Sequence, residues 1–157
     1  MTTERPATFE HPQVGPLNWR EGGVAYQREI ALGGLFVSFE VIVDPPAWTA
    51  PMTVSALIDQ GAATLATVRT NWERINDRIG ASLVEEYGER WRGARPVLSA
   101  NQLLEHLRLM SVTVYHDGHA EMFFSDDGVD TEGLFSGHYV IVVLLSSGEV
   151  IDVSLAG

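Results

Sequence analysis

The feature that most constrains the fold is a long block of helical periodicity, residues 54–91, placed between two blocks of strand-like alternation. Apolar or small side chains recur in this block every three or four residues, which is the spacing of one helix face. They are Leu57, Gly61, Leu65, Val68, Trp72, Ile75, Ile79 and Leu83. Because Asn71, Asn76 and Gly80 each offer a place for a break, we expect two helices over 54–69 and 72–91, or one long kinked helix. A short helix over 100–107 should follow, capped by Ser99.

Strand-like segments with short turns flank the helical block on both sides. The expected strands are 17–19, 24–32 and 35–43 before it, and 110–116, 120–125, 137–145 and 150–155 after it. Short turns, and one longer acidic loop before 137–145, join consecutive strands into hairpins, so the sheet should be mainly antiparallel. The sequence therefore predicts an α+β fold, in which two β-meanders form a mainly antiparallel sheet and are separated by two or three helices packed on one face.

The length of the chain, 157 residues, suits a single domain over residues 1–157. Pro6 and Pro12 interrupt its start, and we expect residues 1–15 to form an extended N-terminal arm. The absence of cysteine excludes disulfides and thiolate chemistry. The start lacks the basic and apolar parts of a secretory signal, and the longest apolar run, 139–145, is too short to span a bilayer. We therefore expect a cytoplasmic protein.

The charge of the chain is strongly negative, with 21 acidic against 10 basic residues and a formal net charge of -11. No Lys or Arg follows Arg108, whereas eight carboxylates do. Such a field repels phosphate backbones and anionic lipid, so we expect neither nucleic acid nor a membrane as partner, but a basic protein. The candidate partner-binding residues are Asp117, Glu121, Asp126, Asp127, Asp130 and Glu132. Solubility alone could also explain an acidic surface.

Three histidines suggest a metal site as an alternative. His116 and His119 flank the Asp117-Gly118 pair, and a two-residue turn there would bring the two imidazoles face to face across the hairpin. A third ligand would be needed, with His138, Asp117 and Glu121 as candidates, and a hydrolase could add Asp126 or Asp127 to the histidines. The acidic loop lacks the ligand spacing of an EF-hand, and no glycine-rich phosphate loop is present, so no cofactor is expected.

The segment 139–145 is apolar on both of its strand faces, which is typical of a strand inside a sheet that is covered on both sides. Two outcomes are open. Either the helices and the N-terminal arm cover both faces, or the helices cover one face and leave the other for a second chain. The second outcome would allow a homo-oligomer.

The last third of the chain resembles a known bacterial family. The segments "LLEHLRLMSVTVYHDGHAEMFFSDDG" and "GLFSGHYVIVV", with the closing "IDVSLAG", are similar to the bacterial domain-of-unknown-function family 2262. The residues that carry this resemblance most clearly are Phe135, Gly137 and His138, after the acidic "DDG" turn. Ser136 departs from the family pattern, which usually has an aromatic residue there, and "VDTE" looks like an insertion. The resemblance implies a fold and no established activity.

From these observations we expect a small acidic binding domain that is not an enzyme, such as an immunity-like protein or an inhibitor of a basic partner. The first alternative is a metal-assisted hydrolase that uses His116, His119 and His138 with nearby aspartates. The second is a homo-oligomeric structural or regulatory module. The sequence favours the non-enzymatic interpretation without deciding the point.

Overall fold

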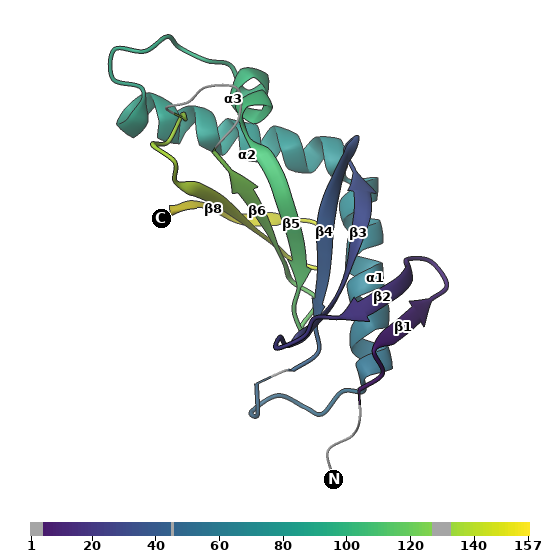
Figure 1. The fold of residues 1–157 in the computed structure, drawn as a ribbon. Helices are drawn as coiled ribbons and strands as arrows, with labels where there is room; N and C mark the ends of the chain where they lie inside the picture. The colour runs from purple at the N-terminus through teal and green to yellow at the C-terminus, as the bar shows by residue number, and fades with distance from the viewer. Residues whose placement is uncertain (1–4, 45, 127–132) are drawn as a thin grey trace.

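The computed structural model describes residues 5–44, 46–126 and 133–157. Within these residues, eight strands form one twisted sheet and follow one another across it in chain order (Figure 1). The strands are β1 (Thr8–His11), β2 (Gly15–Trp19), β3 (Ala25–Leu32), β4 (Leu35–Ile42), β5 (Arg108–Val114), β6 (Ala120–Ser125), β7 (Tyr139–Leu144) and β8 (Val150–Ala156). The sheet is therefore two four-stranded meanders joined side by side.

The join between the meanders is the one parallel pair of the described sheet, β4 with β5. Parallel neighbours require a crossover connection, and the helices supply it. They are α1 (Val54–Thr70), α2 (Trp72–Glu86), the π-helical turn η1 (Tyr87–Trp91) and α3 (Ala100–His106). This arrangement confirms the predicted α+β fold class, with a mainly antiparallel sheet and helices packed against it.

The helix boundaries have local causes. The Thr53 hydroxyl accepts a hydrogen bond from the Ala56 N–H at 3.1 Å and caps the start of α1. Ser99 and Gln102 form a capping box at the start of α3. The chain breaks between α1 and α2 at Asn71, whose side chain donates to the Thr67 carbonyl at 2.9 Å. Of the three positions at which the sequence allowed a break, Asn71 is the one used, whereas Asn76 and Gly80 lie inside α2.

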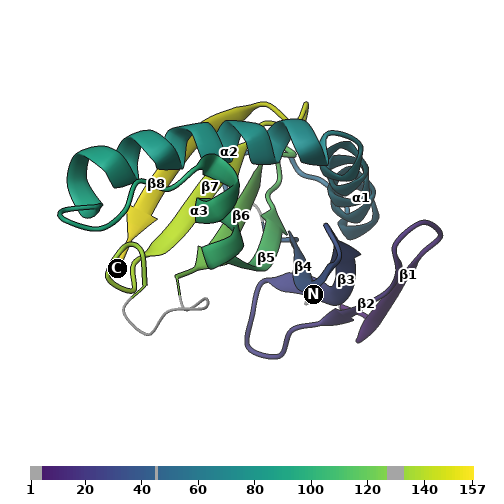
Figure 2. The ribbon, with the colours of Figure 1, turned by 90° about the horizontal axis from the view of Figure 1, so that it is seen from above.

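The core lies between the helices and one face of the sheet. Figure 2 shows α1 and α2 on the same side of the strands. Side chains that alternate along the strands, such as Phe39 and Val142, are fully buried against helix residues such as Ile79. Gly61 lets α1 approach β4 closely, because a Cβ atom there would lie 2.6 Å from the Val41 Cγ2. The other face of the sheet, which we call the open face, has no described helix on it.

Two local features differ from the sequence-based expectations. Part of the expected arm, Thr8–His11, pairs with β2 as the first edge strand of the sheet. The hairpin between β5 and β6 closes through three residues, because the Tyr115 N–H donates to the His119 carbonyl at 3.0 Å. The two-residue turn predicted at Asp117-Gly118 is therefore wrong. Gly118, at φ 82°, adopts the left-handed conformation that closes a three-residue loop.

Among the described residues, no helix is both long enough and apolar enough to cross a membrane.

Candidate functional site

The carboxylate of Asp126, directly after β6, is a structural anchor for the turn 133–137 that leads into β7. Asp126 is only 4% exposed. Its oxygens accept hydrogen bonds from the backbone N–H groups of Leu134 at 2.8 Å, Phe135 at 2.6 Å and Gly137 at 3.2 Å. A buried carboxylate with three donors is satisfied inside the fold and presents little charge outside. Asp126 therefore does not belong with the partner-binding candidates, and Asp127, Asp130 and Glu132 lie outside the described residues.

Arg95 holds the same turn from the opposite side. Its guanidinium donates to the carbonyl oxygens of Gly133 and Leu134, both at 2.9 Å, and to that of Trp91 at 2.5 Å. Asp126 thus binds the N–H groups of the turn, whereas Arg95 binds its carbonyls. This pairing of a carboxylate and a guanidinium fixes the path by which the chain returns into β7. Sequence reasoning missed Arg95, because nothing local links it to a turn about forty positions later.

The turn held by Asp126 and Arg95 contains or adjoins the three residues that carry the family resemblance, Phe135, Gly137 and His138. Phe135 is fully buried, edge-on to the rings of Tyr87 and Trp91 at 6.2 and 6.0 Å between centroids. Gly137 has φ 77°, which favours glycine. The His138 ring lies against Trp91 at 5.0 Å, and its Nδ1 donates to the Phe135 carbonyl at 2.7 Å. Phe135 and Gly137 therefore serve the fold, and His138 is left with its Nε2 as an available acceptor.

The other two histidines lie at the opposite end of the sheet. His119 and His116 belong to the loop that opens β6, whereas His138 precedes β7 next to the far end of β6. The six residues of β6 separate them by about 17 Å at the usual rise per residue. Within residues 5–44, 46–126 and 133–157, no group of three His, Asp or Glu side chains is placed to hold a metal ion. The three histidines do not come together.

At the β5–β6 loop the structure forms a hydrogen-bonded network. Asp117 Oδ1 accepts from both the ring and the backbone N–H of His119, whose ring stacks on Tyr115 at 4.5 Å. The Tyr115 hydroxyl donates to Glu121 at 3.0 Å. Partial burial acts to raise the pKa of Asp117, but the His119 hydrogen bonds outweigh it and lower that pKa below its usual value. Burial, followed by the hydrogen bond and charge of Glu121, raises the pKa of Tyr115 to about 12.

The open face carries an apolar cluster at its centre. The rings of Phe123 and Tyr139 contact each other at 4.6 Å, and Ile141 pairs with Phe123 across the strands. Towards β3 and β4, the Phe36 side chain is 75% exposed beside a hollow of about 420 Å³. Met110, at a β-bulge in β5, borders the same hollow. Contiguous apolar surface of this kind marks interaction sites in proteins.

Carboxylates surround this cluster. Strand alternation and register place four of them on the open face: Glu29, Glu40, Glu121 and Asp152. The basic side chains that the same register places there are Arg108 and, at its border, Arg20, which pairs with Glu40 at 3.1 Å. Of the predicted partner-binding residues, Glu121 lies on this face and Asp117 at its end. Glu29, Glu40, Phe36 and Met110 were missed, although their alternation in the strands could have indicated them.

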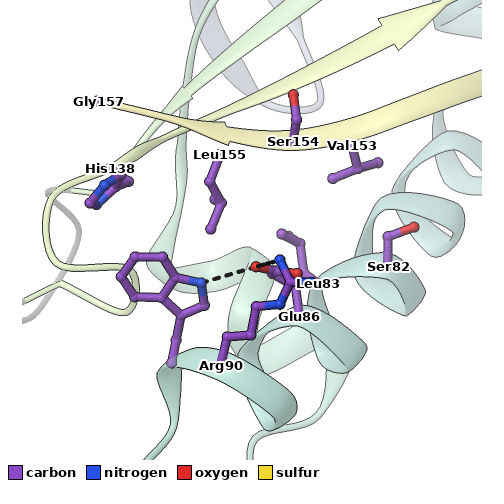
Figure 3. A pocket seen from close by; sticks show the side chains of 10 residues that line it. Ser82, Leu83, Glu86, Arg90, His138, Val153, Ser154, Leu155 and Gly157 are labelled. Carbon is purple, nitrogen blue, oxygen red and sulfur yellow. Dashed lines mark hydrogen bonds and ion pairs between the residues drawn. The ribbon is translucent and has the colours of Figure 1, made fainter.

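A second concave surface lies between α2 and β8, the last strand of the sheet (Figure 3). It has a volume of about 520 Å³, and its walls include Leu83, Trp91, His138 and Leu155. The Trp91 indole N–H donates to Glu86 at 3.1 Å, and Glu86 pairs with Arg90 at 3.6 Å. The lining of this hollow is thus mixed, with apolar side chains beside one charged pair and the polar groups of His138 and Ser154.

The fold and these surfaces define an α+β domain with one open sheet face and a hollow at the edge of the sheet. A comparison with protein-family models gives no match, and comparisons with curated proteins and with solved structures give none either. The resemblance to family 2262 therefore stays a prediction.

Proposed function

We propose that the protein is a non-enzymatic binding domain whose open face engages a basic protein, as an immunity-like protein or inhibitor would. One observation carries the proposal. The open face combines a central apolar cluster, built around Phe123 and Tyr139, with surrounding carboxylates. Desolvated aromatic anchors inside a charged rim are the usual anatomy of a protein interface.

The charge of this face supports a basic partner. Four carboxylates lie on this face, from Glu29 on β3 to Asp152 on β8, and the formal net charge of -11 gives the chain as a whole the same sign. Complementary potentials accelerate association and select partners by charge. A self-paired homo-oligomer is less well supported, since two copies joined through this face would bring their carboxylates together.

The hydrolase alternative has little support in the geometry. His116 and His119 lie at one end of β6 and His138 at the other, and Asp126 is occupied by three backbone donors. Catalysis by this set would need a rearrangement of the sheet. We therefore propose a role without catalysis, in the cytoplasm, and without a resident cofactor.

The test is capture from native extract at low salt, followed by elution with rising salt. We expect a basic protein to be retained by the wild-type chain and by Glu105→Lys, whose exposed carboxylate lies on α3. Glu29→Lys, which makes the same charge change on the open face, should release that protein at clearly lower salt.

A second pair of variants examines the apolar cluster. Tyr139→Ser should abolish retention, because it removes one half of the aromatic pair, whereas Val97→Ser, at an exposed apolar residue of the α2–α3 connection, should leave retention unchanged. If Tyr139→Ser and Val97→Ser retain the partner equally, or if Glu29→Lys and Glu105→Lys do, the open face is not the surface that binds it. A column that retains no basic protein would remove the proposal itself.

A further inference from the structure

One row of side chains on α2 and η1 faces the last strand of the sheet. Its members follow one another four residues apart, so each lies next to the one before it on the helix surface: Arg74, Arg78, Ser82, Glu86 and Arg90. All five line hollows whose other wall is β8 or the turn before it. We call this surface the α2–β8 groove.

The groove has two consecutive parts. A hollow of about 250 Å³ lies between Arg74 and Arg78 on one side and the segment 148–150 on the other. The hollow of about 520 Å³ continues along β8 from Val153, next to Ser82, to Trp91 and His138. Together the two hollows flank the start of β8, at 148–150, and its end, at 153–155, and the strand is long enough to pair with an extended peptide of several residues.

The free edge of β8 provides backbone partners for such a peptide. β8 is the last strand in the sheet order and pairs with β7 alone among the described strands. An edge strand with one partner presents unpaired N–H and C=O groups that can bind a further strand. Figure 3 shows Leu155 directed towards the helix and Ser154 directed away from it, so side chains along this edge alternate as in a regular strand.

The charge of the groove differs from that of the molecule. Seven of the ten basic residues lie between 69 and 108, and three of them belong to this row. Arg74 and Arg78 are exposed and make no ion pair with any described residue, and Arg90 contacts only Glu86, at 3.6 Å. Two carboxylates line the hollows beside these three arginines: Glu149, and Glu86, which is already engaged by Trp91 and Arg90. The other acidic residues of α2 and η1 line neither hollow; they are Glu73, Asp77, Glu85 and Glu89. The arginines therefore favour an acidic occupant.

We propose that the α2–β8 groove binds an extended acidic peptide segment, which adds a strand to the free edge of β8. The carboxylates of the peptide pair with Arg74 and Arg78, and one of its apolar side chains enters the larger hollow, against Trp91 and Leu155. The His138 Nε2 can accept a hydrogen bond from the peptide, since Nδ1 already donates to the Phe135 carbonyl. This site lies apart from the open face and requires a ligand of the opposite charge.

The test uses a panel of synthetic eight-residue peptides that alternate Glu with Val and carry one Phe at varied positions. Binding is followed by fluorescence anisotropy at low salt. We expect at least one acidic peptide to bind. Its counterpart with Lys in place of Glu should bind at least about tenfold more weakly, because its ammonium groups would face the arginines of the groove. Methylation of alternate backbone nitrogens of that peptide should abolish binding, since it blocks strand addition.

Two protein variants locate the site. Arg74→Gln/Arg78→Gln should weaken binding about five- to tenfold, the amount that two exposed ion pairs supply. Arg5→Gln/Arg20→Gln removes the same charge elsewhere and should bind as the wild type does.

The proposal is overturned if every acidic peptide fails to bind at about 1 mM, the weak limit of specific recognition. It is also overturned if the acidic and basic peptides bind equally, if the methylated peptide binds unchanged, or if both double variants lose the same affinity. A wild-type dimer that Arg74→Gln/Arg78→Gln dissociates would overturn it in favour of a second copy of this chain. None of these results bears on the open face, because the Glu29→Lys comparison tests that face independently.

Discussion

Replacement of the buried carboxylate by Asp126→Ala should destabilise the protein severely. The carboxylate accepts two hydrogen bonds from the buried N–H groups of Leu134 and Phe135, and a longer one from Gly137. Hydrogen bonds to charged groups contribute about 1.5–3 kcal/mol each, and a buried donor left without an acceptor costs about 1–3 kcal/mol. Allowing for relaxation and for the weaker third bond, we expect a loss of about 3–5 kcal/mol from the free energy of unfolding.

The assay is urea denaturation followed by circular dichroism, with a thermal melt as a check. A loss of this size is a large part of the 5–15 kcal/mol that is roughly typical of a domain. It should lower Tm by about 8–15 °C for a chain of this length. Asp126→Asn keeps one acceptor oxygen and should lose about half as much. Asp152→Ala, at an exposed strand position, should change stability by less than about 0.5 kcal/mol. A loss below about 1 kcal/mol for Asp126→Ala would refute the assignment of Asp126 as the anchor of the turn.

Three further predictions follow from particular contacts. Gly61→Ala should lower the free energy of unfolding by about 1–3 kcal/mol, because the new methyl group would overlap the Val41 side chain. Gly88→Ala is the control: its methyl group has open space, so the variant should be neutral or stabilising. Urea titrations of the two variants measure the difference. The tyrosinate absorbance titration should show Tyr115 ionising near pH 12 instead of near pH 10, because its pKa is raised to about 12, and this transition should be missing in Tyr115→Phe. The contribution of the Tyr115 phenol to stability is present below pH 10, the usual phenol pKa, and is lost as pH rises through about 12. The free energy of unfolding of Tyr115→Phe should therefore fall less between about pH 10 and pH 12 than that of the wild type. Ser136→Gly should stabilise the protein by up to about 1 kcal/mol in a thermal melt, since Ser136 has φ 53° and glycine adopts that conformation without strain.

Much of the fold could be predicted because the hydrophobic period changes clearly along the chain. Alternation in Val37, Phe39 and Val41 gives way to a spacing of three or four from Leu57 onward, and the local turns fix the neighbours of most strands. The sequence pattern left open whether one or both faces of the sheet are covered. That question depends on how a helix pair of fixed length lies across eight strands, which is a property of the packed structure and not of a local pattern.

The site was less predictable because its contacts are long-range. A carboxylate beside a second aspartate and a glycine is typical of an exposed turn, and only the return of Leu134 and Phe135 buries Asp126. The register of the β5–β6 hairpin was misjudged by one residue, since Asp117-Gly118 suits both a two-residue and a three-residue loop. That shift sets Thr113 opposite Glu121. It also separates His116 from His119 as a facing pair.

The most direct test of the central claim uses a photo-cross-linking amino acid in place of Tyr139, at the centre of the open face. The same amino acid in place of Val97, exposed on the α2–α3 connection, is the matched control. Both proteins are irradiated in native extract at low salt, and the products are identified by mass spectrometry. We predict that position 139 cross-links to a basic protein, that position 97 does not, and that the product disappears as salt rises. The absence of a product at 139, or the same products at both positions, would contradict the proposal that the open face is the binding surface.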